Sequence, residues 1–246
     1  MPSPQRAPFV ALTTLLRRRF PSIVDPSETI ARGLVQVDGA PVTNPRSRVR
    51  ATASVRVLAP KPLRGTLKLR GALRELRVSV SGLVALDLGA AAGGFTQALL
   101  EAGAARVYAV DAGAGQLRGW LRADPRVVNL ERTNLADVGP HLVPEPVDLV
   151  TMDLSYLPLA DALPQIDPAV LAPAATVLAL VKPTYELHSA ALAADPESVA
   201  QAVEKVVRVA LALGWSAVAA APSRHEGARG AVEVFVRATT MSSQVD

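Results

Sequence analysis

The sequence predicts an α/β protein: a doubly wound, mostly parallel sheet with helices on both faces, preceded by a small α+β domain. From Val84 onward, short apolar runs alternate with helical patterns, the order that produces parallel strands. The first of these runs, Val84–Leu88, leads through a glycine-rich turn into a helical pattern. Basic residues concentrate in the first third of the chain, and Pro60 and Pro62 separate that part from the rest.

The composition favours a globular protein of a reducing compartment. Hydrophobic residues make up 50% of the 246 residues, enough for a sizeable core. The chain has no cysteine, which excludes disulfides, thiolate metal sites and a cysteine nucleophile. The longest apolar run, Val209–Ala221, is shorter than the ~18 residues that a membrane span needs. We therefore expect a cytoplasmic protein that requires neither a membrane nor a metal.

Charge is distributed unevenly along the chain. Residues 1–80 contain 15 Lys or Arg and 4 Asp or Glu, whereas residues 81–246 contain 11 and 18. A basic first part on an acidic remainder indicates an attachment that binds nucleic acid. A basic face that only keeps the protein soluble is the alternative.

The first part reads as two short helices followed by strands. Apolar spacing predicts a helix over Val10–Phe20, and Asp25 is a typical cap for a second helix that ends at Gly33. The Asp38-Gly39 pair predicts a hairpin, and alternation predicts one strand over Val49–Leu58.

The hairpin sequence L-V-Q-V-D-G-A-P-V-T-N-P, Leu34–Pro45, resembles an S4 RNA-binding domain. The Arg-x-Asp opening and the Ser-Arg pair usual in that domain are absent here. The resemblance implies that residues 1–60 bind RNA, through contacts to phosphates that give affinity more than sequence choice. The positive side chains available for this are Arg17, Arg18, Arg19, Arg32, Arg46 and Arg48.

The remainder divides into a linker and opening segment, residues 61–80, and a second domain, residues 81–246. Strands are expected at Val84–Leu88, Arg106–Val110, Val127–Leu130, Val147–Met152, Thr176–Val181, Trp215–Ala221 and Val232–Arg237. Helices are expected at Phe95–Ala102, Gln116–Arg122, Leu159–Gln165 and Pro196–Leu213. In such a sheet, ligands bind at the carboxyl ends of the strands.

The stretch V-A-L-D-L-G-A-A-A-G-G-F-T predicts a strand, a tight turn and a helix start. Gly89 permits the turn, and Gly93 and Gly94 would let a ligand approach the backbone closely. Asp111, at the end of the following strand, can accept both ribose hydroxyls of a nucleoside cofactor. Ala91 stands where a dinucleotide fingerprint has its second glycine, which favours S-adenosylmethionine over NAD.

Four ionisable residues fall where this site is expected. Lys68 lies in the opening segment, Asp153 and Lys182 follow consecutive apolar strands, and Glu233 begins the last strand. A charged residue that closes one strand is often merely solvated. Two at successive strand ends beside a glycine-rich turn indicate a functional site.

The chain also resembles the S4-linked, FtsJ-like 2′-O-methyltransferases of the TlyA (hemolysin A) type. The matching pieces are R-G-T-L-K-L-R-G-A-L, L-D-L-G-A-A-A-G-G-F-T, V-Y-A-V-D-A-G-A-G-Q-L, D-P-R-V-V-N-L-E-R-T-N, M-D-L-S-Y and L-V-K-P-T-Y-E. The resemblance implies a Rossmann-like class I methyltransferase domain, S-adenosylmethionine as methyl donor, and ribosomal RNA or ribosomal subunits as partner. It implies 2′-O-methylation of ribosomal RNA, with cytidine as the expected nucleotide.

The resemblance also implies the roles of individual residues. The catalytic Lys-Asp-Lys-Glu tetrad falls on Lys68, Asp153, Lys182 and Glu233. The cofactor-binding positions are Gly89, Ala90, Gly93, Gly94, Phe95, Asp111, Thr133 and Asn134. Arg64 joins the residues expected to bind RNA.

A ribose hydroxyl is a poor nucleophile unless its proton is removed or strongly hydrogen-bonded. A lysine could accept that proton or hold positive charge in place, and the sequence leaves both roles open for Lys182. Ala91-Ala92 and Ala231 stand where the family usually has Ser-Thr and Asn. These departures motivate an alternative, a non-catalytic protein that binds RNA or the ribosome and keeps the methyltransferase fold.

Overall fold

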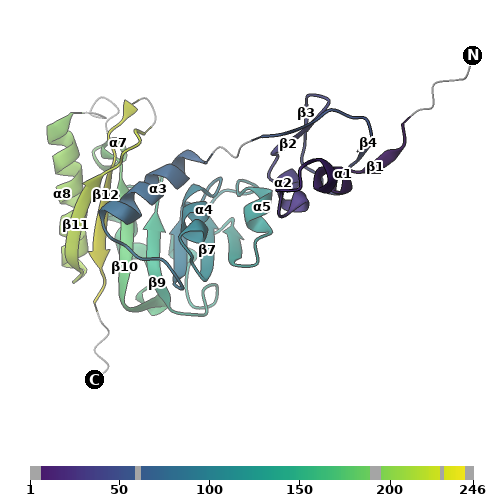
Figure 1. Ribbon diagram of the computed structural model, residues 1–246. Coiled ribbons are helices and arrows are strands. Elements are labelled where there is room, and N and C mark those ends of the chain that lie inside the picture. The colour runs from purple at the N-terminus through teal and green to yellow at the C-terminus, as the bar shows by residue number, and fades with distance from the viewer. Residues whose placement is uncertain (1–6, 59–61, 189–194, 228–229, 242–246) are drawn as a thin grey trace, which may run out of the picture. The chain divides into compact units, whose positions relative to one another are not determined.

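The computed structural model describes residues 7–58, 62–188, 195–227 and 230–241 (Figure 1). The chain divides into two compact units. Residues up to 61 form the first unit together with residues 118–120, and residues 62–117 and 121–246 form the second.

The first unit combines two helices with short antiparallel strands. Asp25 caps the second helix through hydrogen bonds from the backbone N–H groups of Ser27 and Glu28, as its sequence predicts. Positive φ angles at Asp38 and Gly39 form the expected hairpin turn. The elements are β1 (Phe9–Ala11), α1 (Leu12–Arg19), α2 (Pro26–Ala31), β2 (Val35–Val37), β3 (Ala40–Val42), β4 (Arg48–Arg50) and β5 (Val55–Val57).

The prediction of a single strand over Val49–Leu58 is wrong. β4 pairs with β1, whereas β5 pairs with β2 in a separate three-stranded sheet, and a turn lies between them. Alternation continues across this turn, so the pattern alone does not show that the chain changes sheets. The core of the unit consists of aliphatic side chains from both helices and the strands: Leu12, Leu15, Leu16, Ile30, Val35 and Val49.

The second unit has a seven-stranded sheet, as the alternating pattern predicts. The strands are β6 (Val84–Leu88), β7 (Arg106–Asp111), β8 (Val127–Glu131), β9 (Val147–Met152), β10 (Leu171–Val181), β11 (Ser216–Pro222) and β12 (Val234–Thr239). Their order is β11-β12-β10-β9-β6-β7-β8. All neighbours are parallel except β12, which is antiparallel to β10 and β11. The strand order reverses between β6 and β9, where α/β sheets bind ligands.

Helices cover both faces of this sheet (Figure 1). The helices are α3 (Arg64–Glu75), α4 (Gly94–Glu101), α5 (Gly119–Arg122), α6 (Leu159–Ala162), α7 (Pro183–Glu186) and α8 (Pro196–Ala212). α3 packs against α4 on one face, while buried side chains of α6 and α8 join the core on the other. The result is the doubly wound α/β fold that the sequence predicts.

Several element boundaries differ from the expected ones. Residues 64–75, expected within a linker and opening segment, form the helix α3. The expected helix Gln116–Arg122 begins only at Gly119, and β10 begins at Leu171, five residues before the expected Thr176. Glu233 precedes β12 instead of beginning the last strand. None of these differences moves a predicted site residue to another part of the sheet.

Candidate active site

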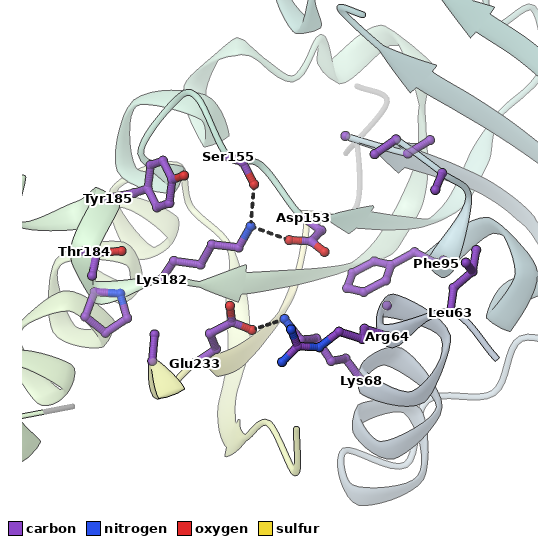
Figure 2. Close-up of a pocket in the computed structure, with 18 of the residues that line it drawn as sticks. Leu63, Arg64, Lys68, Phe95, Asp153, Ser155, Lys182, Thr184, Tyr185 and Glu233 are labelled. Atoms are coloured by element: carbon purple, nitrogen blue, oxygen red, sulfur yellow. Dashed lines mark hydrogen bonds and ion pairs between the residues drawn. The ribbon is translucent and has the colours of Figure 1, made fainter. Parts of the chain in front are cut away.

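A cavity of about 920 Å³ lies at the carboxyl ends of β6, β9 and β10, where the strand order reverses (Figure 2). Its volume is in the range of small-molecule sites. Five segments that are distant in the sequence line it, within residues 63–68, 89–95, 153–155, 182–188 and 231–233. The fold therefore gathers the catalytic residues predicted from the sequence around one cavity.

The glycine-rich turn forms one wall of this cavity. Gly89 has a φ of 83°, and a Cβ atom there would lie 2.7 Å from the carbonyl oxygen of Asp153. Gly94 instead permits close packing of α4 on α3, because its Cβ would lie 2.8 Å from the Cα of Gly65. Of the predicted cofactor-binding residues, the cavity is lined by Gly89, Ala90, Gly94 and Phe95.

Gly93 has a packing reason for being glycine. Its φ is 94°, and a Cβ there would lie 2.1 Å from Leu121 Cδ1 and 2.8 Å from Leu117 Cδ1. Gly93 does not line the cavity described above. Its predicted contact with a ligand stays a prediction.

Asp111 holds the glycine-rich turn in place. Its Oδ2 accepts a hydrogen bond from the backbone N–H of Ala91 at 2.8 Å, and its Oδ1 accepts one from Gly113 at 2.7 Å. A carboxylate has about four lone-pair sites, so acceptor capacity remains for a ligand. Asp111, Thr133 and Asn134 do not line the cavity, although the backbone N–H of Thr133 bonds to the carbonyl of Asp111. Their contact with a cofactor stays a prediction.

The four predicted catalytic residues form two ion pairs facing the cavity (Figure 2). Lys68 of α3 pairs with Glu233, and both side chains are at least nine-tenths buried. Removal of one partner of such a pair leaves an uncompensated buried charge, which typically costs about 3–5 kcal/mol. In the second pair, Lys182 Nζ lies 2.6 Å from Asp153 Oδ1.

Lys182 is held by three oxygen atoms. Besides Asp153, its Nζ donates to the carbonyl oxygen of Leu154 and to Ser155 Oγ, both at 2.8 Å. An ammonium group has three N–H donors, so this set of acceptors matches its charged form. Ser155 is not among the site residues predicted from the sequence. Its position two residues after Asp153 was the available signal.

A buried carboxyl group lies beneath the glycine-rich turn, inside β6. Asp87 has no exposed surface, and it accepts hydrogen bonds from Thr96 Oγ1 at 2.6 Å and from Thr151 Oγ1 at 3.0 Å. Burial raises its pKa to about 6, and the charge of Asp153 adds to the rise. Asp87 thus links β6 to α4 and β9 at the base of the site.

The short helix α7, which the sequence did not predict, adds further residues to the cavity. Thr184 and Tyr185 of α7 line it next to Lys182, and so does His188 just after the helix. The carboxylate of Glu186, 2% exposed, accepts hydrogen bonds from the first backbone N–H groups of α6, and its burial raises its pKa. The pattern P-T-Y-E directly after Lys182 was the signal for this wall of the site.

The arginines predicted to bind RNA differ in how the fold uses them. Arg19 donates to two backbone carbonyl oxygens at 2.6 Å, and Arg48 donates to one at 2.9 Å. Arg64, at the cavity, donates to the carbonyl oxygens of Glu226 and Gly227. The other four are exposed or half-buried: Arg17, Arg18, Arg32 and Arg46.

Neither a metal cluster nor a membrane span is present among the residues that the structure describes. No group of three or more His, Cys, Asp or Glu side chains is arranged to hold a metal ion in these ranges. No helix in this part of the chain is long and apolar enough to cross a membrane.

Comparison with known proteins points to one family. The model of the FtsJ-like methyltransferase family matches residues 63–240. The 16S/23S rRNA (cytidine-2′-O)-methyltransferase TlyA of Mycobacterium tuberculosis is 39% identical over 227 residues, which are 89% of this chain and 84% of that protein. The 23S rRNA (cytidine-2′-O)-methyltransferase TlyA of Campylobacter jejuni is 29% identical over 178 residues, 70% and 68% of the two chains. A hemolysin homologue from Streptococcus thermophilus has a solved structure with a TM-score of 0.68 and 26% identity, covering 95% of this chain and 89% of its own.

Proposed function

The chain belongs to the FtsJ-like methyltransferase family, and we propose that it transfers a methyl group from S-adenosylmethionine to a ribose 2′-hydroxyl of ribosomal RNA. The observation that carries the proposal is the cavity at the strand-order reversal, where a glycine-rich turn faces two lysine–carboxylate pairs. Cytidine is the proposed nucleotide, because the named relatives act on cytidine.

The residues of the cavity fit S-adenosylmethionine as methyl donor. The turn presents only small side chains to the cavity before Phe95, which leaves room for a ligand against the backbone. Gly89, Ala90 and Gly94 would hold the cofactor, and Asp111 would accept its ribose hydroxyls. When bound, S-adenosylmethionine supplies a sulfonium methyl group. Every other contribution to the reaction comes from the chain and the RNA.

Lys182 is the proposed group nearest the attacking hydroxyl. Asp153, Leu154 and Ser155 fix its Nζ at one point of the cavity, so that a ribose hydroxyl would meet a positive charge held in place. The buried Lys68–Glu233 pair places a second positive and a second negative side chain at fixed positions in the wall of the cavity. As a positioner, Lys182 would act in its charged form. As a general base, it would first have to lose a proton, and the rate would then rise with pH.

The first unit is proposed to bind ribosomal RNA through phosphate contacts of its exposed arginines. Binding of this kind depends steeply on salt and carries little sequence information. Sequence choice at the methylated nucleotide would then come from the second unit. With ribosomal RNA as its substrate, the protein would act in the cytoplasm.

Transfer of tritiated methyl groups tests the proposal. Ribosomal RNA and intact ribosomal subunits are incubated with labelled S-adenosylmethionine, and the 2′-O-methylated nucleotides are mapped. We expect incorporation at a cytidine by the wild-type protein and little by Lys182→Ala. Arg208→Ala serves as a control for loss of a positive charge, because Arg208 is exposed on α8 and does not line the cavity. Absence of transfer to every ribosomal RNA substrate would contradict the proposal.

The alternative, a non-catalytic RNA-binding protein, is favoured by one feature of the cavity. Ala231 lines it close to Glu233, where the family usually has an asparagine side chain. Calorimetric titration with S-adenosylmethionine separates the two functions. Cofactor binding together with methyl transfer supports the enzyme, and RNA binding without either supports the alternative.

A further inference from the structure

The second unit carries a cluster of positive charge on α3 and directly after it. Residues 62–80, which contain α3, hold five Lys or Arg and one Glu, whereas residues 81–246 hold 11 basic and 18 acidic residues. One of the five basic residues, Lys68, is buried in its pair with Glu233. The other four are exposed: Arg64, Arg70, Arg74 and Arg77. An RNA strand that approaches this acidic unit would therefore find its favourable electrostatic surface along α3.

Arg70 and Arg74 point to the same side of α3. They lie one helical turn apart and line a groove of about 570 Å³ between α3 and α4. Arg77 follows three residues later, just beyond the end of the helix. Arg64, at the other end of α3, lines the active-site cavity. Lys68 is the last residue of α3 that lines the cavity, and at 1.5 Å per residue the helix continues for about 10 Å beyond it.

The three arginines outside the cavity are largely available to a ligand. Arg70 pairs with Glu101 at 2.5 Å, but both side chains are almost half exposed, and exposed pairs contribute only ~0–1 kcal/mol. Neither Arg74 nor Arg77 has an acidic partner within 4.0 Å among the residues that the structure describes. Guanidinium groups bind phosphate through paired hydrogen bonds.

We propose that Arg70, Arg74 and Arg77 form a phosphate-binding strip for the RNA strand adjoining the methylated nucleotide. The inference rests on the proposed function, since it takes RNA as the substrate. The strip adds a second RNA-binding surface, on the catalytic unit itself, to the one proposed for the first unit. It binds the RNA equally in the ground state and the transition state, because it lies outside the cavity.

The test uses the full chain with Arg70, Arg74 and Arg77 all replaced by Gln. RNA binding is measured by filter binding over a range of salt concentrations, and methyl transfer is measured at saturating and limiting RNA. We expect the Kd for ribosomal RNA to rise ~10–100-fold and the KM to rise with it, with kcat and S-adenosylmethionine affinity unchanged. The slope of log K against log salt should fall by about 0.7–0.9 for each phosphate that the variant no longer neutralises.

A matched pair of single variants separates local binding from total charge. Arg74→Gln and Arg208→Gln each remove one positive charge from an exposed side chain, but Arg208 lies on α8 and pairs with Glu204. We expect Arg74→Gln to weaken RNA binding and Arg208→Gln to leave it near the wild-type value. Equal effects of the two would overturn the strip, because bulk charge would then explain them.

An unchanged Kd and salt slope in the triple variant would also overturn the strip. The binding measurement needs no turnover, so the strip is judged separately from the proposed reaction. If the wild-type protein binds RNA but transfers no methyl group, the proposed function fails, and the binding data still decide the strip.

Discussion

Replacement of Asp87 by asparagine should change the pH dependence of folding stability, because this carboxyl group titrates inside the core. It is fully buried, and burial raises its pKa from 3.8 to about 6 despite the hydrogen bonds from Thr96 and Thr151. A raised pKa means that the folded protein binds this proton more tightly than the unfolded chain does. The contribution of Asp87 to the free energy of unfolding is therefore largest below about pH 4 and falls as pH rises to about 6.

The size of this effect follows from the shift in pKa. At about 1.4 kcal/mol per pKa unit, a rise from 3.8 to about 6 corresponds to roughly 3 kcal/mol. Asparagine has almost the same shape as aspartate and carries no charge. Its oxygen can accept from one threonine, and its amide can donate to the other once that hydroxyl rotates. The free energy of unfolding of Asp87→Asn, minus that of the wild type, should therefore increase by roughly 3 kcal/mol as the pH rises from about 4 to about 8.

Urea unfolding of both proteins at several pH values across this range measures the difference. Other groups that titrate in this range cancel when the two curves are subtracted. Asp124→Asn provides a control, because hydrogen bonds from Arg126 lower the pKa of Asp124. Its titration therefore lies below this pH range, and the stability curve of Asp124→Asn should run parallel to that of the wild type. Parallel stability curves for wild type and Asp87→Asn would refute the reasoning, since Asp87 would then titrate alike in the folded and unfolded states.

Three further predictions concern the site and the RNA. Asp111→Ala should weaken S-adenosylmethionine binding by roughly 1–3 kcal/mol, because a charged acceptor is removed together with its bond to the turn; equal calorimetric affinities would contradict this. Lys182→Arg should lower the rate of single-turnover methyl transfer ~10²-fold or more without weakening cofactor binding. A planar guanidinium can neither match the three acceptors of Lys182 nor take up a proton. Near-wild-type rates would exclude Lys182 as the group that acts on the ribose hydroxyl. Replacing the exposed Arg17 and Arg18 by Gln should weaken ribosomal RNA binding several-fold and reduce its salt dependence, and unchanged filter binding would argue against RNA contacts there.

The sequence was sufficient for the strands of the seven-stranded sheet and for the charged residues at their ends. Alternation of apolar runs and helical patterns predicts the parallel sheet, and parallel strands bring their carboxyl ends together. Asp153 and Lys182 therefore meet as expected, although they follow different strands of the sheet. Local patterns are sufficient for these predictions because the backbone geometry of a helix or a strand sets the period of its apolar residues.

Features that depend on how one element packs on another, or on the path of a loop, could not be predicted. α3 contains two glycines and has no side-chain cap, and its packing on α4 depends on the close approach of Gly65 to Gly94. The hydrogen bond between Ser155 and Lys182 depends on the path of the loop after β9. The change of sheet between β4 and β5 likewise leaves no mark in the alternation of side chains.

The pairing of Lys68 with Glu233 has a consequence for protein synthesis. The two residues are 165 positions apart, and Glu233 directly precedes β12. The buried Lys68 of α3 is therefore neutralised only when this late segment of the catalytic unit has folded. Contacts between such distant positions form late, because the loop between them must close first. A nascent chain that ends before Glu233 would already contain the glycine-rich turn and the Asp153–Lys182 pair. It would still lack the Lys68–Glu233 pair. The catalytic unit would thus become competent for its reaction only after the segment that carries Glu233 has been synthesised and has folded onto α3.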